Sequence, residues 1–228
     1  LVVTSCSKYR YEEVADDPLH SRIYTLDNGL KVYMTVNGEA PRIQTYIAVR
    51  VGSKNDPLET TGLAHYFEHL MFKGTKSFGT QDYEAERPML DEIERLFEVY
   101  RTTTDADERR AIYARIDSVS QEASKLAIPN EYDKLMSAIG AAGTNAFTSY
   151  DMTVYTEEIP SNQIDNWAKI QSDRFANAVI RGFHTELETR STTCRSRATA
   201  ARCWTRSWWR SIRTIPTECT PCWVRRRI

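Results

Sequence analysis

Residues 62–75 read GLAHYFEHLMFKGT, and the interpretation of the whole chain starts from this stretch. Its centre has the spacing H-x-x-E-H, formed by His65, Glu68 and His69. On a helix both imidazoles project from one face, and Glu68 lies one step round the same side. Two neutral imidazoles suit zinc, and a neighbouring carboxylate can accept a proton from a water whose pKa the ion lowers to about 7. The alternative is that both histidines are ordinary surface or core residues.

The residues on either side mark the expected ends of this helix. Thr60 and Thr61 are suitable N-cap residues, because their hydroxyls can accept hydrogen bonds from the first N–H groups of a helix. Gly74 follows as a C-terminal stop, since glycine readily takes the left-handed conformation found there. The motif is therefore expected near the centre of a helix.

Segments on both sides alternate between apolar and polar residues as strands do. Residues 22–26 and 30–36 flank an Asp-Asn-Gly turn, which predicts a β-hairpin. Residues 43–51 are apolar enough to predict a central strand of a sheet. Two more strands are expected further along the chain, at 145–150 and 152–156. Together these segments predict mixed α and β structure.

Residues 83–129 follow a different pattern. Apolar side chains recur at steps of three and four from Leu90 to Tyr100 and again from Ile112 to Leu126, which predicts two amphipathic helices. A polar segment near Thr102 joins them. We interpret 83–129 as an inserted helical hairpin with solvated charged faces. A further helix is expected from Ser161 onward.

Three stretches, in this order, resemble the insulinase/pitrilysin family of zinc peptidases. They are GLAHYFEHLMFKGT, the later GTNAFTSYDMTVYTEEIP and the acidic FHTELET. The inverted H-x-x-E-H spacing is a signature of such enzymes. The resemblance covers roughly Ile23 to Thr189, which we treat as a peptidase unit over 22–189. It implies an α+β fold, a two-layer α/β roll in which helices pack on an antiparallel-rich sheet.

The resemblance also implies roles for individual residues. It implies that His65 and His69 bind Zn2+, that Glu68 activates water, and that the substrate is a peptide. Family members hold the substrate as an added strand, and the segment matching theirs is Asn145, Ala146, Phe147 and Thr148. A plain core strand is the alternative for this segment. Four such units make a full enzyme in the family, so a C-terminal half or a partner subunit is expected elsewhere.

The family's third zinc ligand is missing from its expected position. In the family it is a glutamate seven residues after one that matches Glu186, and this position holds Thr193 here. Glu188 lies on a different part of the helical wheel, so the ligand role does not transfer to it. Glu186 itself resembles a supporting residue behind the ligands. The sequence therefore predicts an incomplete zinc site.

The composition changes after Thr189. Residues 1–189 carry 20 basic and 30 acidic side chains, whereas 190–228 hold ten arginines, no lysine and a single acid. This tail also contains four of the five cysteines and four of the five tryptophans. No amphipathic period runs through it. Such a composition is typical of GC-rich coding sequence read in the wrong frame.

A codon-level comparison supports an out-of-frame tail at 190–228. The codons of Arg190 to Cys194 can be chosen so that the neighbouring frame reads EEYNM, which continues the family's ligand helix. Those of Ser211 to Val224 can yield LYPNHPYGMHTLLG, which resembles the family's next segment. Other readings of the tail are weaker. Cys219 and Cys222 lack a second C-x-x-C, and the arginines and tryptophans predict only non-specific nucleic-acid binding.

The first residues carry a hypothesis about location. Leu1 to Cys6 resembles the end of a bacterial lipoprotein signal, so Cys6 is a candidate lipid anchor in a tail that we assign to residues 1–21. The alternative is a free N-terminal tail. A lipoprotein of this kind would be periplasmic or associated with the outer membrane. No run of eighteen apolar residues occurs, so a transmembrane helix is not expected.

Two functions remain open from the sequence. One is a zinc endopeptidase unit of an enzyme that degrades oligopeptides. The other is a non-catalytic peptide-binding relative, or an inactive remnant, of such a peptidase. Zinc binding separates them, because two imidazoles without a third ligand are expected to hold the ion weakly.

Overall fold

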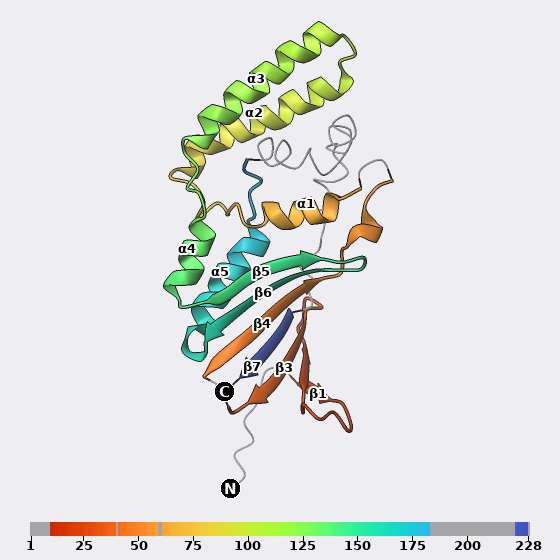
Figure 1. The fold of residues 1–228 in the computed structure, drawn as a ribbon, viewed down its shortest axis with the longest axis vertical. Coiled ribbons are helices and arrows are strands. Elements are labelled where there is room, and N and C mark those ends of the chain that lie inside the picture. Colours follow the sequence, from red (N-terminus) through yellow and green to blue (C-terminus); the bar gives the residue numbers. More distant parts are fainter. Residues whose placement is uncertain (1–9, 40, 59–60, 183–221, 228) are drawn as a thin grey trace.

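The computed structural model describes residues 10–39, 41–58, 61–182 and 222–227. Within these ranges one seven-stranded sheet has the order β1-β2-β3-β7-β4-β6-β5 (Figure 1). The pairs are antiparallel except β3 with β7. The strands are β1 (Tyr11–Glu13), β2 (Arg22–Thr25), β3 (Lys31–Asn37), β4 (Arg42–Val49), β5 (Ala142–Thr148), β6 (Thr153–Pro160) and β7 (Cys222–Arg227).

The helices form a second layer against this sheet. In β4 the side chains of Ile43, Thr45 and Ile47 are buried in alternation, so one face of the strand is directed into the core. The main apolar cluster joins this face to the helices through Met71 and Trp167, among others. The helices are α1 (Leu63–Leu70), α2 (Tyr83–Thr102), α3 (Ala106–Ser124), α4 (Glu131–Ala138) and α5 (Ile164–Ala176), with short 3-10 turns η1 (Ser53–Asn55) and η2 (Ser161–Gln163). The predicted α+β fold is therefore confirmed.

Two strands were not expected from the sequence. β1 lies inside residues 1–21, which the sequence presents as a tail, and it pairs with β2. β7 lies in the 190–228 tail and is placed between β3 and β4 by backbone pairing on both sides. Backbone pairing does not depend on the reading frame that supplied the side chains. The out-of-frame origin of residues 190–228 therefore stays a prediction.

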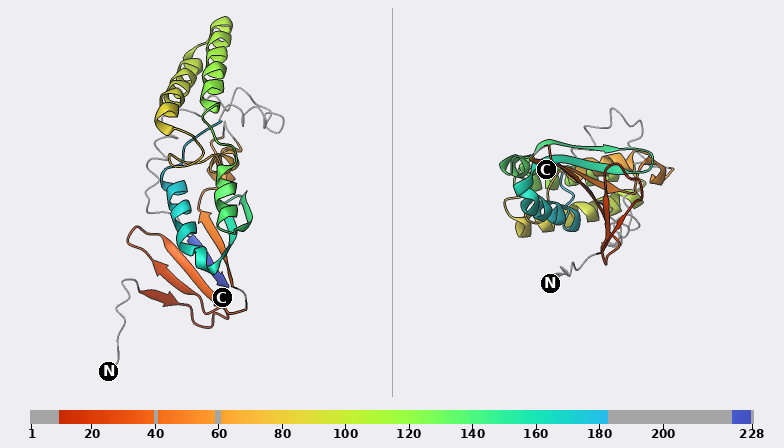
Figure 2. Two further views of the ribbon diagram at one scale, coloured as in Figure 1. Left: turned by 90° about the vertical axis from the view of Figure 1, so that its left-hand side faces the viewer. Right: turned by 90° about the horizontal axis from the view of Figure 1, so that it is seen from below.

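The helices α2 and α3 form a long antiparallel pair that projects away from the sheet (Figures 1 and 2). A second apolar cluster includes Leu70 of α1, Phe97 of α2 and Ile116 of α3. This cluster connects the hairpin to α1. Its status as an insertion stays a prediction. None of the described helices combines the length and apolar composition needed to cross a membrane.

Candidate metal centre

The H-x-x-E-H motif lies on α1, and the ends of this helix differ from the prediction. The N-cap is Gly62, which has a left-handed backbone with φ of 93°, rather than Thr60 or Thr61. The carboxylate of Asp56 accepts hydrogen bonds from the N–H groups of Gly62 at 2.7 Å and Ala64 at 2.8 Å. A negative charge at this end also suits the helix dipole. The helix ends at Leu70, well before the predicted stop.

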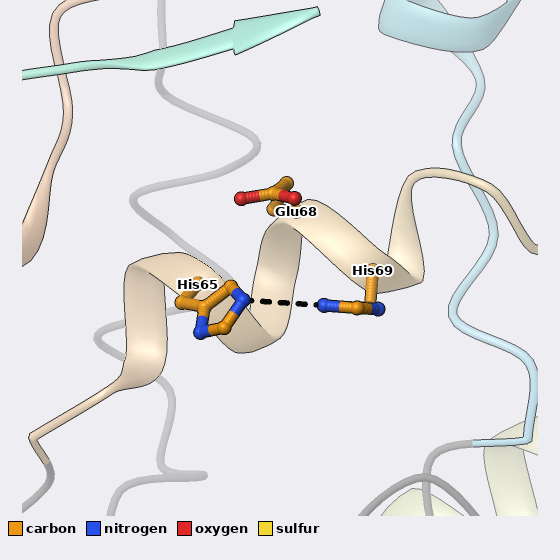
Figure 3. A group of neighbouring side chains, drawn as sticks. All are labelled: His65, Glu68 and His69. Carbon is orange, nitrogen blue, oxygen red and sulfur yellow. Dashed lines mark hydrogen bonds between the residues drawn. The ribbon is translucent and has the colours of Figure 1, made fainter. Parts of the chain in front are cut away.

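The two imidazoles approach each other on one side of α1 (Figure 3). The Nε2 atoms of His65 and His69 are 3.3 Å apart. In a tetrahedral site with Zn–N bonds of about 2.0–2.1 Å, two nitrogen ligands lie about 3.3–3.4 Å apart. His65 is exposed and His69 is half-buried, so the site opens to solvent on the His65 side. The donor atoms and their separation therefore fit one zinc ion.

Glu68 is the third member of this group. One donor atom from each of His65, Glu68 and His69 lies within 4.8 Å of the others, and among the described residues no other group of three His, Cys, Asp or Glu side chains is arranged in this way. The Glu68 side chain is 6% exposed, and its Oε2 accepts a hydrogen bond from the Thr148 hydroxyl. A deprotonated carboxylate can only accept hydrogen bonds, so Glu68 can receive a proton next to the imidazoles.

The predicted substrate segment forms part of β5, at the edge of the described sheet. Asn145 and Phe147 are exposed, with Phe147 at 50%, whereas Ala146 and Thr148 are half-buried. Two-residue alternation therefore directs Ala146 and Thr148 towards the helices. Among the described strands β5 pairs with β6 alone, so its outer backbone edge is a candidate for accepting another strand. A substrate role for these residues stays a prediction.

A buried polar cluster behind α1 escaped sequence reasoning. Arg174 of α5 is fully buried and donates a hydrogen bond to the carbonyl oxygen of Met71, the C-cap residue of α1, at 3.0 Å. Its guanidinium carbon lies 4.3–4.5 Å from three ring centroids, those of Phe72, Tyr132 and Tyr155. Such stacking stabilises a cation that has been removed from water. Arg174 therefore anchors the C-terminal end of α1.

Hydrogen bonds connect Arg174 to other buried polar groups. The Tyr132 hydroxyl accepts from Arg174 at 2.8 Å and donates to Glu157 at 2.6 Å. Burial raises the pKa of Tyr132, so this hydroxyl stays protonated and remains a donor. Gln171 donates to the same hydroxyl at 2.8 Å. The sequence does contain a pattern that predicts part of this cluster. Trp167, Gln171 and Arg174 recur at helical spacing, so they share one face of α5.

Three residues singled out in the sequence lie outside the described residues. They are Glu186, the candidate supporting residue; Thr193, at the position expected for the third ligand; and Cys6, the candidate lipid anchor. The structure therefore leaves these predictions untested. It places two predicted ligands and the predicted base together on α1, and it adds the contact with Thr148.

Comparison with known proteins identifies the same stretch. The profile of the insulinase family (peptidase family M16) matches residues 31–94, which include β3, β4 and α1. The chain is 29% identical over 110 residues to the "putative zinc protease mug138" of Schizosaccharomyces pombe. It is 30% identical over 114 residues to "Protease 3" of Escherichia coli. These matches cover 46% and 50% of this chain, but only 11% and 10% of those relatives.

A solved structure shares the fold over a wider range. The periplasmic protease PqqL from Escherichia coli superposes on 95% of this chain and 23% of its own, with a TM-score of 0.58 and 16% sequence identity. The chain therefore spans less than a quarter of that protein. The profile match, the protease relatives and the α+β fold around the H-x-x-E-H helix agree with one another. Over residues 31–94 the chain is similar to the insulinase/pitrilysin family of peptidases.

Proposed function

We propose that this chain is the N-terminal unit of a zinc metalloendopeptidase that hydrolyses peptide bonds of oligopeptides. The observation that carries the proposal is the 3.3 Å separation of the His65 and His69 Nε2 atoms, which equals the spacing of two ligands on tetrahedral zinc. The neighbouring carboxylate of Glu68 completes the H-x-x-E-H arrangement. Of the relatives, mug138 is named as a zinc protease.

Each group of the site has a separate task in this proposal. Zinc, when bound, acts as a Lewis acid that polarises the scissile carbonyl and makes a water more acidic. His65 and His69 hold the ion, and α1 fixes their spacing. Glu68 accepts the proton of the attacking water and later returns it to the leaving amine. The outer edge of β5 pairs with the peptide and aligns the bond to be cleaved.

The described residues supply one zinc ligand fewer than a catalytic zinc site needs. Glu68 serves as base in this proposal, so the described residues supply two imidazoles, whereas catalytic zinc sites use three protein ligands. We attribute the missing glutamate to a change of reading frame after Thr189. The same shortage favours the second candidate function, a non-catalytic peptide-binding relative or remnant. Under both, the present chain binds zinc weakly and does not cleave peptides.

The relatives support proposals about location and partners. PqqL is described as a periplasmic protease, and we propose a bacterial periplasmic location for this protein as well, with Cys6 as a candidate lipid anchor to the outer membrane. The chain spans only part of its relatives. We therefore propose that a C-terminal half or a partner subunit closes over the peptide and excludes water.

Resequencing codons 185–228 tests the reading frame, and a cleavage assay tests the chemistry. We expect the full in-frame gene product to cleave an internally quenched oligopeptide. Glu68→Gln is expected to lower its kcat by about 10²–10⁴-fold, because general-base catalysis contributes that much. Zinc affinity of the variant should stay unchanged. Cleavage by the in-frame product that survives Glu68→Gln would refute the assignment of the base.

A further inference from the structure

Thr148 lies where the edge strand β5 meets the metal helix α1. Its hydroxyl donates a hydrogen bond to Oε2 of Glu68, which is 80 positions away in the sequence. We propose that Thr148 is a positioning residue for Glu68. It holds one carboxylate oxygen so that the other stays directed at the proton to be accepted. This inference rests on the proposed function, because it concerns the orientation of the proposed base.

The environment of Glu68 makes this hydrogen bond important. The side chain is 6% exposed, so water has little access to its carboxylate. A buried carboxylate without a donor is unfavourable, which means that the bond to Thr148 is kept rather than exchanged with solvent. Threonine also has few side-chain rotamers because it is branched at Cβ. A threonine hydroxyl therefore restricts the orientation of Glu68 more than a freely rotating donor does.

Thr148 is itself held in place by the strand next to it. It is paired with Thr153 in the β5–β6 ladder, and their hydroxyl oxygens are 3.3 Å apart. The Thr153 hydroxyl donates to the carbonyl of Val51 at 2.9 Å, just beyond β4. Each hydroxyl has one proton, so with the Thr153 proton given to Val51 and the Thr148 proton given to Glu68 the two hydroxyl oxygens are neighbours without a hydrogen bond between them. The proton of the Thr148 hydroxyl is directed to Glu68.

The tip of the β5–β6 hairpin is also fixed from outside. The N–H groups of Ser53 and Lys54 donate to the carbonyls of Ser149 and Tyr150, both at 3.0 Å. Gly52 permits this close packing, since a Cβ there would lie 2.5 Å from each of these two carbonyl oxygens. The donor to Glu68 therefore stands on a rigid corner of the sheet.

This arrangement connects the base to the strand proposed to hold the substrate. Ala146 and Thr148 face the helices, while the outer backbone of the same strand is the proposed peptide-binding edge. One strand would thus orient both the peptide and Glu68. Removal of the hydroxyl is therefore expected to lower the rate of the chemical step, while the affinities for peptide and zinc stay the same.

The first test uses the present 228-residue chain without metal. Thr148→Val keeps the shape of the side chain but removes its hydroxyl, and Glu68→Ala removes the acceptor. Urea unfolding of both single variants and the double variant measures whether the effects are coupled. We expect Thr148→Val to lower the urea midpoint strongly when Glu68 is present and weakly when it is absent. Additive effects would contradict the inference.

Thr156→Val provides the matched control for this cycle. Thr156 lies on β6 opposite Asn145, is half-buried and accepts from Gln44 at 2.9 Å. It belongs to the same hairpin, but its hydroxyl is hydrogen-bonded to Gln44 rather than to Glu68. Its effect on the urea midpoint is expected to be the same with and without Glu68. Coupling as large as that of Thr148 would show that the cycle reports general hairpin damage.

The second test uses the full in-frame gene product and an internally quenched peptide. We expect Thr148→Val to lower kcat by about 10–100-fold, as for other residues that orient a metal site from behind, with KM and the zinc Kd unchanged. Thr148→Ser, which restores the hydroxyl, is expected to recover most of the activity. A rise in KM at constant kcat, or a serine variant as slow as the valine variant, would overturn the inference.

Failure of the proposed function gives a different result from failure of this inference. If the parent in-frame product neither binds zinc nor cleaves peptide, the proposed function is wrong, while the urea cycle still decides whether Thr148 orients Glu68. If the parent is active and Thr148→Val matches it in kcat, the positioning role is wrong and the proposed function stands. If Thr148→Val does not fold, the Thr148→Ser variant supplies the comparison, and a serine variant with less than a tenth of parental kcat contradicts the inference.

Discussion

Two polar groups of the molecule differ in almost every respect, one on α1 and the other between β6 and α5. The group on α1 consists of His65, Glu68 and His69, and it opens to solvent at His65. The group behind it is centred on Arg174 and Glu157, both with 0% exposure. Several hydrogen bonds connect the members of the buried group, while on α1 the two imidazoles bring their Nε2 atoms within 3.3 Å of each other.

The two groups are expected to contribute differently, the buried group to the stability of the fold and the α1 group to the binding of a cation. Buried polar groups are retained when other buried groups satisfy them, and their removal costs stability. Two imidazole nitrogens at ligand spacing contribute little to folding, but they create a site for a cation. The Arg174 hydrogen bond to Met71 connects the groups, since it holds the end of the helix that carries the imidazoles. Mutations in the two groups are therefore expected to affect different quantities.

The largest expected change in stability comes from the buried group. Arg174→Met removes the cation and leaves the carboxylate of Glu157 buried beside it, 3.6 Å from the lost Nη1 atom. We expect the free energy of unfolding to fall by about 3–5 kcal/mol, the usual effect of breaking a buried ion pair. Urea unfolding measures it. Arg95→Ala, which removes an exposed pair with Glu92, is the control and is expected to change little.

A smaller effect is expected at the start of the metal helix. Asp56→Ala removes the acceptor for the N–H groups of Gly62 and Ala64. Loss of a side-chain cap typically costs about 1 kcal/mol of folding free energy. Thermal unfolding should therefore show a modest loss of stability for Asp56→Ala. The loss should be smaller for Asp56→Asn, whose amide oxygen can still accept a hydrogen bond. A fall as large as that of Arg174→Met would mean that Asp56 does more than cap α1.

The smallest effect on stability is expected in the α1 group itself. His65 is exposed, so His65→Ala is expected to change the free energy of unfolding of the metal-free chain by no more than about 0.5 kcal/mol. Urea unfolding in the presence of a chelator measures this value. A loss of several kcal/mol would show that His65 is structural, and the contrast between the two groups would then disappear.

The sequence predicted those features that depend on neighbouring residues. The H-x-x-E-H spacing places His65 and His69 on one face of α1, and alternation around residues 27–29 predicts the β2–β3 hairpin, because both patterns are local. The N-cap was wrong because Asp56 reaches the helix from a preceding loop rather than from the cap position. A capping rule based on adjacent residues cannot detect such an acceptor.

Contacts between distant segments could not be read from the sequence. The hydrogen bond from Thr148 to Glu68 depends on β5 lying next to α1, and it joins residues 80 positions apart. The ion pair of Arg174 with Glu157 likewise depends on α5 packing against β6. The central place of β7, between β3 and β4, depends on backbone pairing that carries no side-chain pattern. Each of these follows from topology rather than from periodicity.

Zinc titration by calorimetry tests the central claim most directly. The full in-frame gene product is expected to bind one zinc per chain tightly, and His65→Ala is expected to weaken binding more than 100-fold, beyond the 10–100-fold typical of residues behind a ligand. The present chain, with two imidazoles among its described residues, is expected to bind weakly. Tight stoichiometric zinc in the present chain, or none in the in-frame product, would contradict the account.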